Sequence, residues 1–419
     1  MNDLSQTVAT HGARAVERCD LLGRAPYSDM ENGLYRGWLT PAHRQALDVL
    51  TFWMRQAGMS VRMDAMGNLI GRYEGTRQDM APLMIASHID SVRNGGFYDG
   101  PLGVMLGVEC VAALHDCGRR MAFPIEVVAF GDEEGSRFPA AMLTSRAMAG
   151  TLDHADLDMT DARGVTLAEA MRAFGLDPAR WAEAKLAQPP LAYLEAHIEQ
   201  GPVLEARRHA LGTVTGIAAQ LRYEVTVIGK AGHAGTCAMD LRRDALAGAA
   251  EMVLAVEEIA RADKSDLVAT VGKVAALPGA ANVIPGEAVF TLDIRSGNEA
   301  RRDAAAEAIL IRIRALARVR GLGVGIEKIH NLPASPCAPA LMDLMDAAIT
   351  ATGQRPFRLV SGAGHDAMVM EAICPTAMLF IRCKGGVSHH PDESVTVADV
   401  EAGFAAMMHF IEGLGSQHV

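Results

Sequence analysis

The sequence has few cysteines for its length, and no two of them are close neighbours in the sequence. Its seven cysteines are dispersed along 419 residues and form no C-x-x-C pair. A disulfide framework and a thiolate zinc site both need paired cysteines, so neither is expected. Any bound metal ion must therefore be held by histidine and carboxylate side chains.

Long apolar runs and blocks of positive charge are also absent. No stretch approaches the roughly eighteen apolar residues of a membrane span, and the N-terminal segment MNDLSQTVATHGARAVERCD lacks the apolar core of a signal peptide. We therefore expect a cytoplasmic protein without a membrane partner. The formal charge of −11 and the lack of a Lys/Arg-rich block argue against nucleic acid, because phosphate binding needs clustered positive charge. A small-molecule substrate is expected instead.

Two large enzyme classes lack their signatures. No G-x-S-x-G elbow is present, which disfavours a serine hydrolase, and no P-loop or G-x-G-x-x-G fingerprint supports a nucleotide enzyme. The composition is nevertheless that of a globular protein, with 50% hydrophobic and 21% charged residues. A chain of this length can bury a large core, and its length favours two domains.

The apolar patterning of the first third of the chain predicts a β-α-β unit. Residues 83–87 (LMIAS) and 125–130 (IEVVAF) are typical of buried strands, and residues 101–115 (PLGVMLGVECVAALH) of a helix with a buried face. Such a unit implies a parallel sheet, in which functional groups gather at the carboxyl ends of the strands. We therefore expect the segments HID (88–90) and GDEEG (131–135) at one edge of one sheet.

The segment 212–328 has a pattern of its own. Its predicted element order is β-α-β-β-α-β, which is typical of a ferredoxin-like α/β domain. We interpret it as an inserted lid or dimerisation domain. The flanking parts, 1–211 and 329–419, would form one discontinuous catalytic domain with a mostly parallel sheet flanked by helices, so the predicted fold class is α/β.

Polar side chains follow the predicted strands. His88 and Asp90 leave a strand end on the same face, where a carboxylate can orient a metal-binding imidazole, although this pair alone is more typical of a surface or core histidine. Asp99 precedes the helix, where an N-cap is the ordinary interpretation. A third cluster, Asp132 to Glu134, would concentrate negative charge at the same edge. Cations would relieve that repulsion.

Two further histidines complete a plausible set of metal ligands. His197 lies in EAHIEQGP and His389 in GGVSHHPDES, where His390 is the alternative. The predicted ligands are His88, Asp99, Glu134, His197 and His389. With neutral imidazoles, two dications beside two carboxylates leave a positive charge that suits lowering the pKa of a bound water from 15.7 to about 7. Glu133 is then the natural general base.

Seven groups of segments make the sequence similar to the M20 metallopeptidase superfamily, and within it to the amidase, hydantoinase and carbamoylase branch. They are SHIDSVRNGGFYDGPLGV, FGDEEGSRF, LEAHIEQGPVLE, GKAGHAGT, NVIPGE with LDIRS, SGAGHDA and GGVSHHPDE, and they extend from about residue 86 to 394. That branch contains N-carbamoyl-L-amino acid hydrolases, allantoate amidohydrolases and β-ureidopropionases.

The resemblance implies a role for each candidate residue. It assigns His88 and His197 to one metal ion, Glu134 and His389 to the other, and Asp99 to a bridging position between them. It also implies Glu133 as the base and Asp90 as the residue that orients His88. His389 is preferred to His390 because it directly follows the serine, as in the family pattern. Two divalent ions, Zn²⁺ or Mn²⁺ with Co²⁺ possible, are implied together with a homodimer formed through the lid domain.

The same resemblance implies a substrate pocket. Its residues are Gln200, His233, Asn282, Arg295 and the backbone around Gly362. In the predicted strand VFTLDIRS, the apolar residues share one face and leave Asp293 and Arg295 on the other. Arg295 would hold a carboxylate through two hydrogen bonds, and His233 would stabilise an oxyanion. Without the resemblance, Arg295 is more typical of an exposed sheet arginine, and His233, Asn282 and Gln200 of ordinary loop residues.

We therefore expect a metal-dependent amidohydrolase that cleaves the ureido C–N bond of a small carboxylated substrate and releases ammonia and CO₂. Allantoate and N-carbamoyl-L-amino acids both fit, and the segment LYRGWLTPAHRQAL favours allantoate slightly. One alternative is a dipeptidase or acyl-amino-acid deacylase of the same superfamily. A remote alternative is a binding homologue without catalytic activity.

Overall fold

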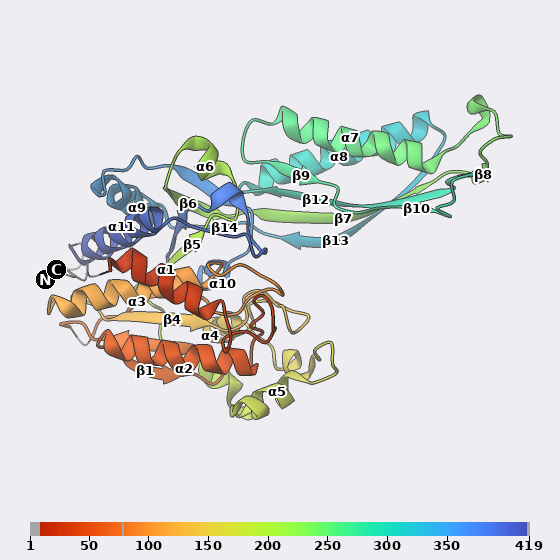
Figure 1. Cartoon of the computed structure of the whole chain (residues 1–419). Helices are drawn as coiled ribbons and strands as arrows, with labels where there is room; N and C mark the ends of the chain where they lie inside the picture. The colour runs from red at the N-terminus through yellow and green to blue at the C-terminus, as the bar shows by residue number, and fades with distance from the viewer. Residues whose placement is uncertain (1–8, 78, 417–419) are drawn as a thin grey trace, which may run out of the picture. The chain divides into compact units, whose positions relative to one another are not determined.

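The computed structural model describes residues 9–77 and 79–416, which divide into two compact units (Figure 1). The larger unit contains the chain up to Thr215, Pro336–Leu359 and the chain from Gly364 onward, and the smaller contains Gly216–Ser335 and Val360–Ala363. The first eight residues of the segment considered for a signal peptide lie outside the described residues. No helix in the described part of the chain combines the length and apolar character that a bilayer crossing needs.

The elements up to residue 217 are α1 (His11–Leu22), α2 (Pro41–Gln56), β1 (Ser60–Met63), β2 (Leu69–Tyr73), β3 (Leu83–His88), α3 (Pro101–Asp116), β4 (Ile125–Phe130), α4 (Leu143–Ala149), η1 (His154–Asp158), α5 (Leu167–Phe174), η2 (Pro178–Ala184), β5 (Ala192–Ile198), α6 (Val203–Arg207) and β6 (Leu211–Ile217). The next are β7 (Ala219–Ile228), β8 (Gly232–His233), η3 (Met239–Leu241), α7 (Ala245–Ala262), β9 (Val268–Thr270), β10 (Val274–Leu277), β11 (Val283–Ile284), β12 (Glu287–Ser296), α8 (Glu299–Val319) and β13 (Gly323–Leu332). The last are β14 (Ser335–Pro336), α9 (Pro339–Ala351), β15 (Arg358–Ser361), α10 (Ala367–Met370), β16 (Thr376–Ile381), η4 (Lys384–Gly386) and α11 (Val397–Ser416).

The main sheet of the larger unit is mixed, with parallel pairing at its centre. Its order is β1-β2-β4-β3-β5-β16-β6-β14, and β15 pairs with β6. The strands β4, β3, β5 and β16 are parallel, whereas β1, β2 and β6 pair in the antiparallel sense. The predicted β-α-β unit is confirmed as β3, α3 and β4. The carboxyl ends of β3 and β4 are therefore neighbours, since His88 is paired with Phe130.

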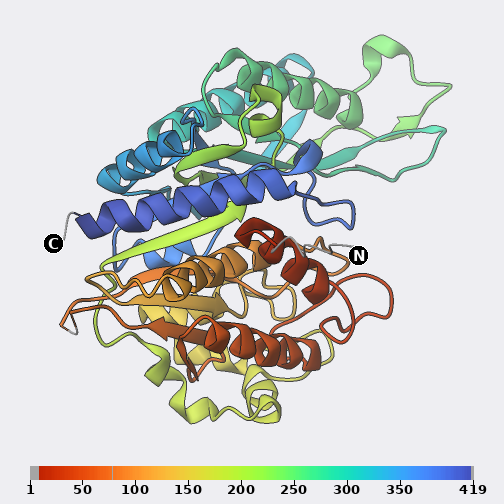
Figure 2. The same cartoon turned by 60° about the vertical axis from the view of Figure 1, so that its left-hand side comes forward.

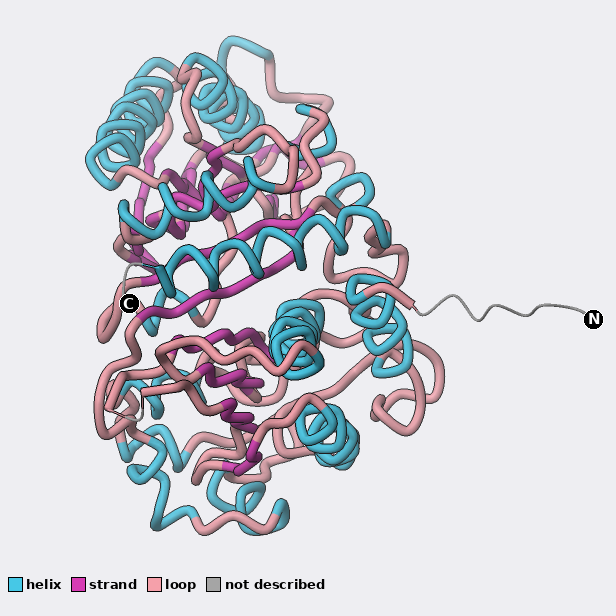
Figure 3. Tube along the Cα trace, turned by 90° about the vertical axis from the view of Figure 1, so that its left-hand side faces the viewer, coloured by secondary structure: helices cyan, strands magenta, loops and turns pink. Residues whose placement is uncertain are grey.

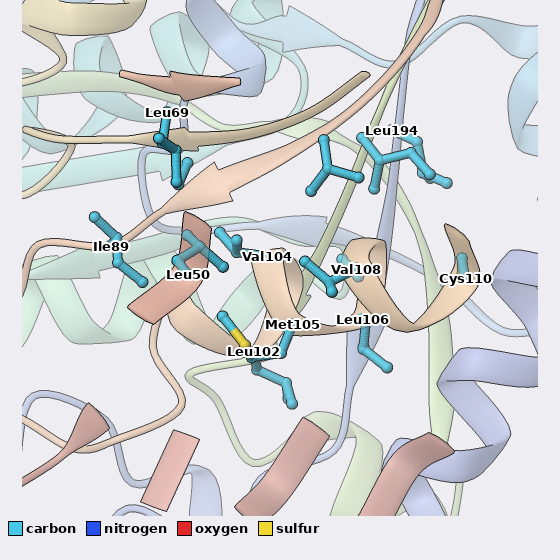
Figure 4. Close-up of a cluster of buried hydrophobic side chains, with 14 of the residues drawn as sticks. Leu50, Leu69, Ile89, Leu102, Val104, Met105, Leu106, Val108, Cys110 and Leu194 are labelled. Atoms are coloured by element: carbon cyan, nitrogen blue, oxygen red, sulfur yellow. The ribbon is translucent and has the colours of Figure 1, made fainter. Parts of the chain in front are cut away.

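Alternate residues of the central strands bury one face of this sheet. The core side chains are Leu83 and Ile85, Ile125, Val127 and Ala129, Ala192, Leu194, Ala196 and Ile198, and Ala377, Leu379 and Ile381. Figure 4 shows residues of α3 in this core, among them Leu102 and Val108, together with Leu194 of β5. His88 and His197 belong to the alternate sets on their strands, so their side chains leave on the opposite face of the sheet.

The two ends of the chain meet in one layer of helices. Helix α1 packs against both α3 and α11, as Figure 2 shows for α1 and α11. The Gly12 amide donates a hydrogen bond to the Glu401 carboxylate at 2.6 Å. Helices α1 and α11 thus pack together over α3 and the core of the larger unit.

The smaller unit is an antiparallel sheet with two helices on one face. Its strand order is β10-β12-β7-β13, with β9 also paired to β12, and the side chains that face α7 and α8 form a separate core. In both units the strands lie as a layer beside helices (Figure 3). In the predicted order β-α-β-β-α-β, the strand after the first helix is instead two short strands, β9 and β10, which both pair with β12. The boundaries expected at residues 212 and 328 fall inside β6 and β13, whereas the units divide a few residues later, at Gly216 and Ser335.

Exchange of Gly103 for alanine tests how closely α3 must approach β5. A Cβ atom at Gly103 would lie 2.1 Å from the backbone oxygen of Ala196, whereas one at the helical Gly413 meets only the flexible end of Leu344. We expect Gly103→Ala to lower the free energy of unfolding by about 1–3 kcal/mol, as overpacking does. Gly413→Ala is the control and should cost less. Chemical denaturation measures both, and equal effects would contradict this view of the helix.

Candidate metal centre

The ends of β3 and β5 bring two buried imidazoles together. His88 is the last residue of β3, and His197 is the penultimate residue of β5. Their Nε2 atoms lie 3.4 Å apart. Both side chains are 1% exposed. The Nδ1 atom of His197 lies 2.9 Å from the Ile198 carbonyl oxygen, and a proton there leaves Nε2 free to accept or to bind a cation.

Asp99 stands between two separate groups of donors. Its Oδ1 atom lies 3.6 Å from Nε2 of His88 and 3.2 Å from Nε2 of His197. Its Oδ2 atom lies 3.2 Å from Nε2 of His389, which in turn is 3.5 Å from the Glu134 carboxylate. The donor atoms of each group of three lie within 4.8 Å of one another. One carboxylate therefore faces both groups, with a different oxygen toward each.

Asp99 reaches this position because it is not the helix cap. The cap of α3 is Gly100, with φ of +84°, followed by Pro101 as the first helical residue, and the Asp99 side chain makes no capping hydrogen bond. A Cβ atom at Gly100 would lie 2.4 Å from the His88 ring. The glycine therefore provides both the left-handed backbone and the space for the imidazole.

Of the two adjacent histidines, only His389 joins a donor group. His389 has φ of +55°, which directs its ring toward Asp99, and half of its side chain remains exposed. His390 turns away, is more exposed, and has its Nδ1 atom 3.6 Å from Asp392. Of the two rings, His389 therefore faces Asp99 and Glu134, and His390 does not.

The electrostatics of the cluster favour bound positive charge. Burial and the proximity of Asp99 raise the pKa of Glu134 to about 7, and burial is the main reason that the pKa of Glu133 lies well above its usual range. Burial would also raise the pKa of Asp99, but hydrogen bonds from three histidines hold it well below its usual value. The hydrogen bond to Asp99 raises the pKa of His389 to about 9. Protons here balance negative charge that a divalent cation would balance equally well.

Asp90 organises the loop that carries Glu133 and Glu134. Its Oδ1 atom lies 3.3 Å from Nδ1 of His88 and accepts the Glu133 amide at 3.1 Å, while Oδ2 accepts the Glu134 amide at 3.2 Å. Fully buried Arg36 lies near enough to act on it electrostatically. Glu133 itself is 8% exposed and belongs to neither donor group. The Glu133 carboxylate therefore lies beside the cluster and is not one of its metal-ligand candidates.

The predicted substrate residues divide between the two units. Gln200 lies in the larger unit, and its amide nitrogen donates to Asp99 at 2.8 Å, so it contacts the donor cluster directly. His233 and Asn282 lie together in the smaller unit, where the Ala234 amide donates to the Asn282 carbonyl oxygen at 2.9 Å. The His233 ring accepts the Gly235 amide at Nδ1, at 3.0 Å, which leaves Nε2 as a hydrogen-bond donor.

Arg295 lies on the helix-free face of β12, as the alternation predicts. Its Nε and Nη2 atoms donate to Asp293 at 2.8 and 3.2 Å, and its Nη1 atom donates to the Gly362 carbonyl oxygen at 2.5 Å. Arg295, Asp293 and Gly362 line a hollow of about 620 Å³ together with Arg222 and Thr291. Since a guanidinium has five N–H donors, two remain for a ligand.

Several polar residues near the cluster were not predicted. Glu195 and His365 are buried beside His197, and His365 lies 4.5 Å from it between ring centroids. Glu195 also accepts the hydroxyl of Tyr193 at 2.8 Å. The segment SGAGHDA and the position of Glu195 two residues before His197 were the available signals. Period two places Glu195 on the same face as His197.

The donor set suits a divalent metal ion. It consists of imidazole nitrogens and carboxylate oxygens, which Zn²⁺ and other first-row dications prefer when thiolates are absent. Within the described residues, the buried Oε1 atom of Glu134 has no hydrogen-bond partner. A buried carboxylate oxygen without a donor is costly, and a cation would satisfy it.

Comparisons with known proteins agree with this description. The chain is 43% identical over 382 residues to an N-carbamoyl-L-amino acid amidohydrolase of Geobacillus stearothermophilus, covering 90% of this chain and 93% of that protein. It is 37% identical to an allantoate deiminase of Arabidopsis thaliana, covering 98% of this chain and 83% of that protein. A solved hydantoinase/carbamoylase family amidase from Burkholderia ambifaria superposes with a TM-score of 0.89 at 36% identity, covering 96% of each chain.

The family model described as peptidase family M20/M25/M40 matches residues 84–413. This range includes every donor of both groups around Asp99, and the chain belongs to that family.

Proposed function

We propose that this protein is a dinuclear metal amidohydrolase that cleaves the ureido C–N bond of a small carboxylated substrate. The observation that carries the proposal is the placement of Asp99, whose two oxygens face two different donor groups. A carboxylate in this arrangement suits a bridge between two cations. His88 and His197 would hold one ion and Glu134 and His389 the other.

Relatives of two kinds support the proposed substrate class. An N-carbamoyl-L-amino acid amidohydrolase and an allantoate deiminase match the chain at 43% and 37% identity, and both names describe small ureido compounds. Both substrate types carry a carboxylate near the reacting group. Zn²⁺ and Mn²⁺ are the proposed ions, a homodimer through the smaller unit is the proposed assembly, and the cytoplasm is the proposed location.

The chain's own residues account for the remaining steps. Two divalent ions at this site would lower the pKa of a water and polarise the substrate carbonyl. Glu133, buried and not engaged by either donor group, takes the proton of the attacking water and passes it to the leaving nitrogen. The Nε2–H group of His233 is a suitable donor for the tetrahedral oxyanion. The two uncommitted N–H groups of Arg295 are suitable donors for the substrate carboxylate.

Metal removal and a substrate panel test the proposal. The protein should contain two ions per chain by elemental analysis, lose activity after chelation, and regain it with Zn²⁺ or Mn²⁺. Ammonia release should be observed from allantoate or N-carbamoyl-L-amino acids. Amine release from acyl-amino acids or dipeptides alone would favour the deacylase or peptidase alternative. Absence of stoichiometric metal and of any turnover would favour the non-catalytic alternative.

Glu133→Gln should abolish most of the activity without removing the metal. The amide cannot accept a proton, so we expect kcat to fall roughly 10²- to 10⁴-fold. Metal content, measured by elemental analysis, should stay at the wild-type value. The control is Glu126→Gln, a buried carboxylate that pairs with Arg72 and lies on β4, the strand that precedes the loop bearing Glu133. The assignment of the base would fail if the two variants had similar kcat values.

Arg295→Lys should weaken substrate binding more than turnover. A lysine cannot reproduce the planar fork, and the loss of a charge-assisted hydrogen bond of about 1.5–3 kcal/mol corresponds to a rise in KM of roughly 10- to 100-fold. Arg301→Lys, at the exposed pair with Asp266 in the same unit, is the matched control. Steady-state kinetics measures both. An unchanged KM for Arg295→Lys would exclude it as the carboxylate anchor.

A further inference from the structure

We propose that Glu393 is a positioning residue that connects the loops bearing Asp99 and His389 and thereby sets the affinity of the second metal ion. The role rests on the dinuclear site proposed above. Glu393 ends the segment GGVSHHPDE, four residues after His389, and has no part in the assignments made so far. It is 5% exposed.

The Glu393 carboxylate holds the backbone that leads into Asp99. Its Oε1 atom accepts two amide hydrogen bonds, from Tyr98 at 2.9 Å and from Asp99 at 3.1 Å. Because these two amides belong to adjacent residues, a single oxygen fixes the direction of the peptide between them. The orientation of the Asp99 side chain toward both donor groups depends on that peptide.

The other oxygen of Glu393 reaches the loop that bears His389. Oε2 lies 3.0 Å from the hydroxyl of Ser388, and the same hydroxyl lies 2.7 Å from Oδ2 of Asp99. Ser388 directly precedes His389 in the chain. The Glu393 carboxylate thus links Asp99 and His389, which face each other in the second donor group. It contacts the backbone amide of Asp99 and the side chain of Ser388, the residue before His389.

Glu393 is not itself a candidate ligand. Both of its oxygens are engaged by the Tyr98, Asp99 and Ser388 groups, and it belongs to neither donor group around Asp99. Its effect on a metal ion would therefore be indirect. Hydrogen-bonded partners behind the ligands typically change metal affinity about 10- to 100-fold when they are removed.

The loop that bears His389 needs such support. Gly385, Gly386 and His389 all have positive φ, of 65°, 67° and 55°. The left-handed conformation is unfavourable for a residue with a side chain, so His389 stays there only if contacts outside its own backbone hold it. The ion pair of His389 with Asp99 supplies one such contact. The Ser388 hydroxyl supplies the other, since it lies within hydrogen-bond distance of both Asp99 and Glu393 and donates its one proton to either carboxylate.

Gly96 shows that the loop before Asp99 is shaped around Glu393. A Cβ atom at Gly96 would lie 2.2 Å from the carboxyl carbon of Glu393 and 2.4 Å from its Cβ atom, and its three nearest neighbours all belong to Glu393. The backbone of Gly96 is not in the positive-φ region. The side chain of Glu393, and not backbone strain, is therefore what excludes a larger residue at this position.

The test compares metal binding by Glu393→Ala and Glu393→Gln with the wild type. Zn²⁺ content after dialysis is measured by elemental analysis, and the two dissociation constants by competition with a chromogenic chelator. We expect Glu393→Ala to bind one ion with near wild-type affinity and the other about 10- to 100-fold more weakly. Glu393→Gln keeps an oxygen for the two amides and should retain most of the affinity. Gly96→Ala, which displaces Glu393 from the other side, should resemble Glu393→Ala.

Asp399→Asn is the matched control for loss of a buried carboxylate. Asp399 lies six residues after Glu393 in the chain. It is 4% exposed, pairs with Arg382 and belongs to neither donor group. It should lose thermal stability and keep both ions. The positioning role is overturned if Glu393→Ala keeps both affinities, if it weakens both ions equally, or if Glu393→Gln is as impaired as Glu393→Ala. A wild-type protein that binds no second ion would instead overturn the proposed function.

Discussion

The arrangement of the larger unit depends on one carboxylate that must face two ways. Asp99 can present its two oxygens to separate donor groups only because Gly100 takes over the start of α3 and leaves the Asp99 side chain free of capping. Pro101 then begins the helix where its missing amide hydrogen costs nothing. The close approach of α3 to β5, made possible by Gly103, keeps this junction beside the histidines.

The rest of the site follows from strand geometry and from a buried acid. Parallel pairing of β4, β3, β5 and β16 places the ends of these strands along one edge, and period two directs His88 and His197 to the face opposite Ile85 and Leu194. Asp90 then fixes the neighbouring loop by accepting two successive amides. Glu393 does the same for the loop before Asp99. Two buried carboxylates therefore orient two loops by the same hydrogen-bonding device.

Much of this could be predicted from the sequence. The β-α-β unit, the alternation in β12 and the delivery of His88 and Glu134 to one edge follow from apolar periodicity alone. The convergence of His197 and His389 did not follow from periodicity, because it depends on β16 pairing with β5, whose paired residues, such as Tyr193 and Thr376, are far apart in the sequence. The assignment of His197 and His389 to neighbouring metal ions came only from the resemblance to a family.

Other features were beyond the reach of sequence patterns. Asp99 has the sequence context of an N-cap, and only the backbone conformation of Gly100 excludes that role. The units divide at Gly216 and Ser335, a few residues from the expected limits of 212 and 328, which fall inside the strands β6 and β13. Glu393 and Ser388 were hidden because side-chain to backbone contacts between distant loops leave no periodic signal.

The order of strands in the main sheet also bears on synthesis. Strand β16 lies between β5 and β6, although it is made after the whole smaller unit. Domains generally fold as units while the chain is being made, so the smaller unit has all of its strands before the larger sheet can close. His389 emerges later still, 30 residues before the end of the chain. A chain that ends before residue 389 therefore lacks one of the three donors of the second group and retains only the group formed by His88, Asp99 and His197.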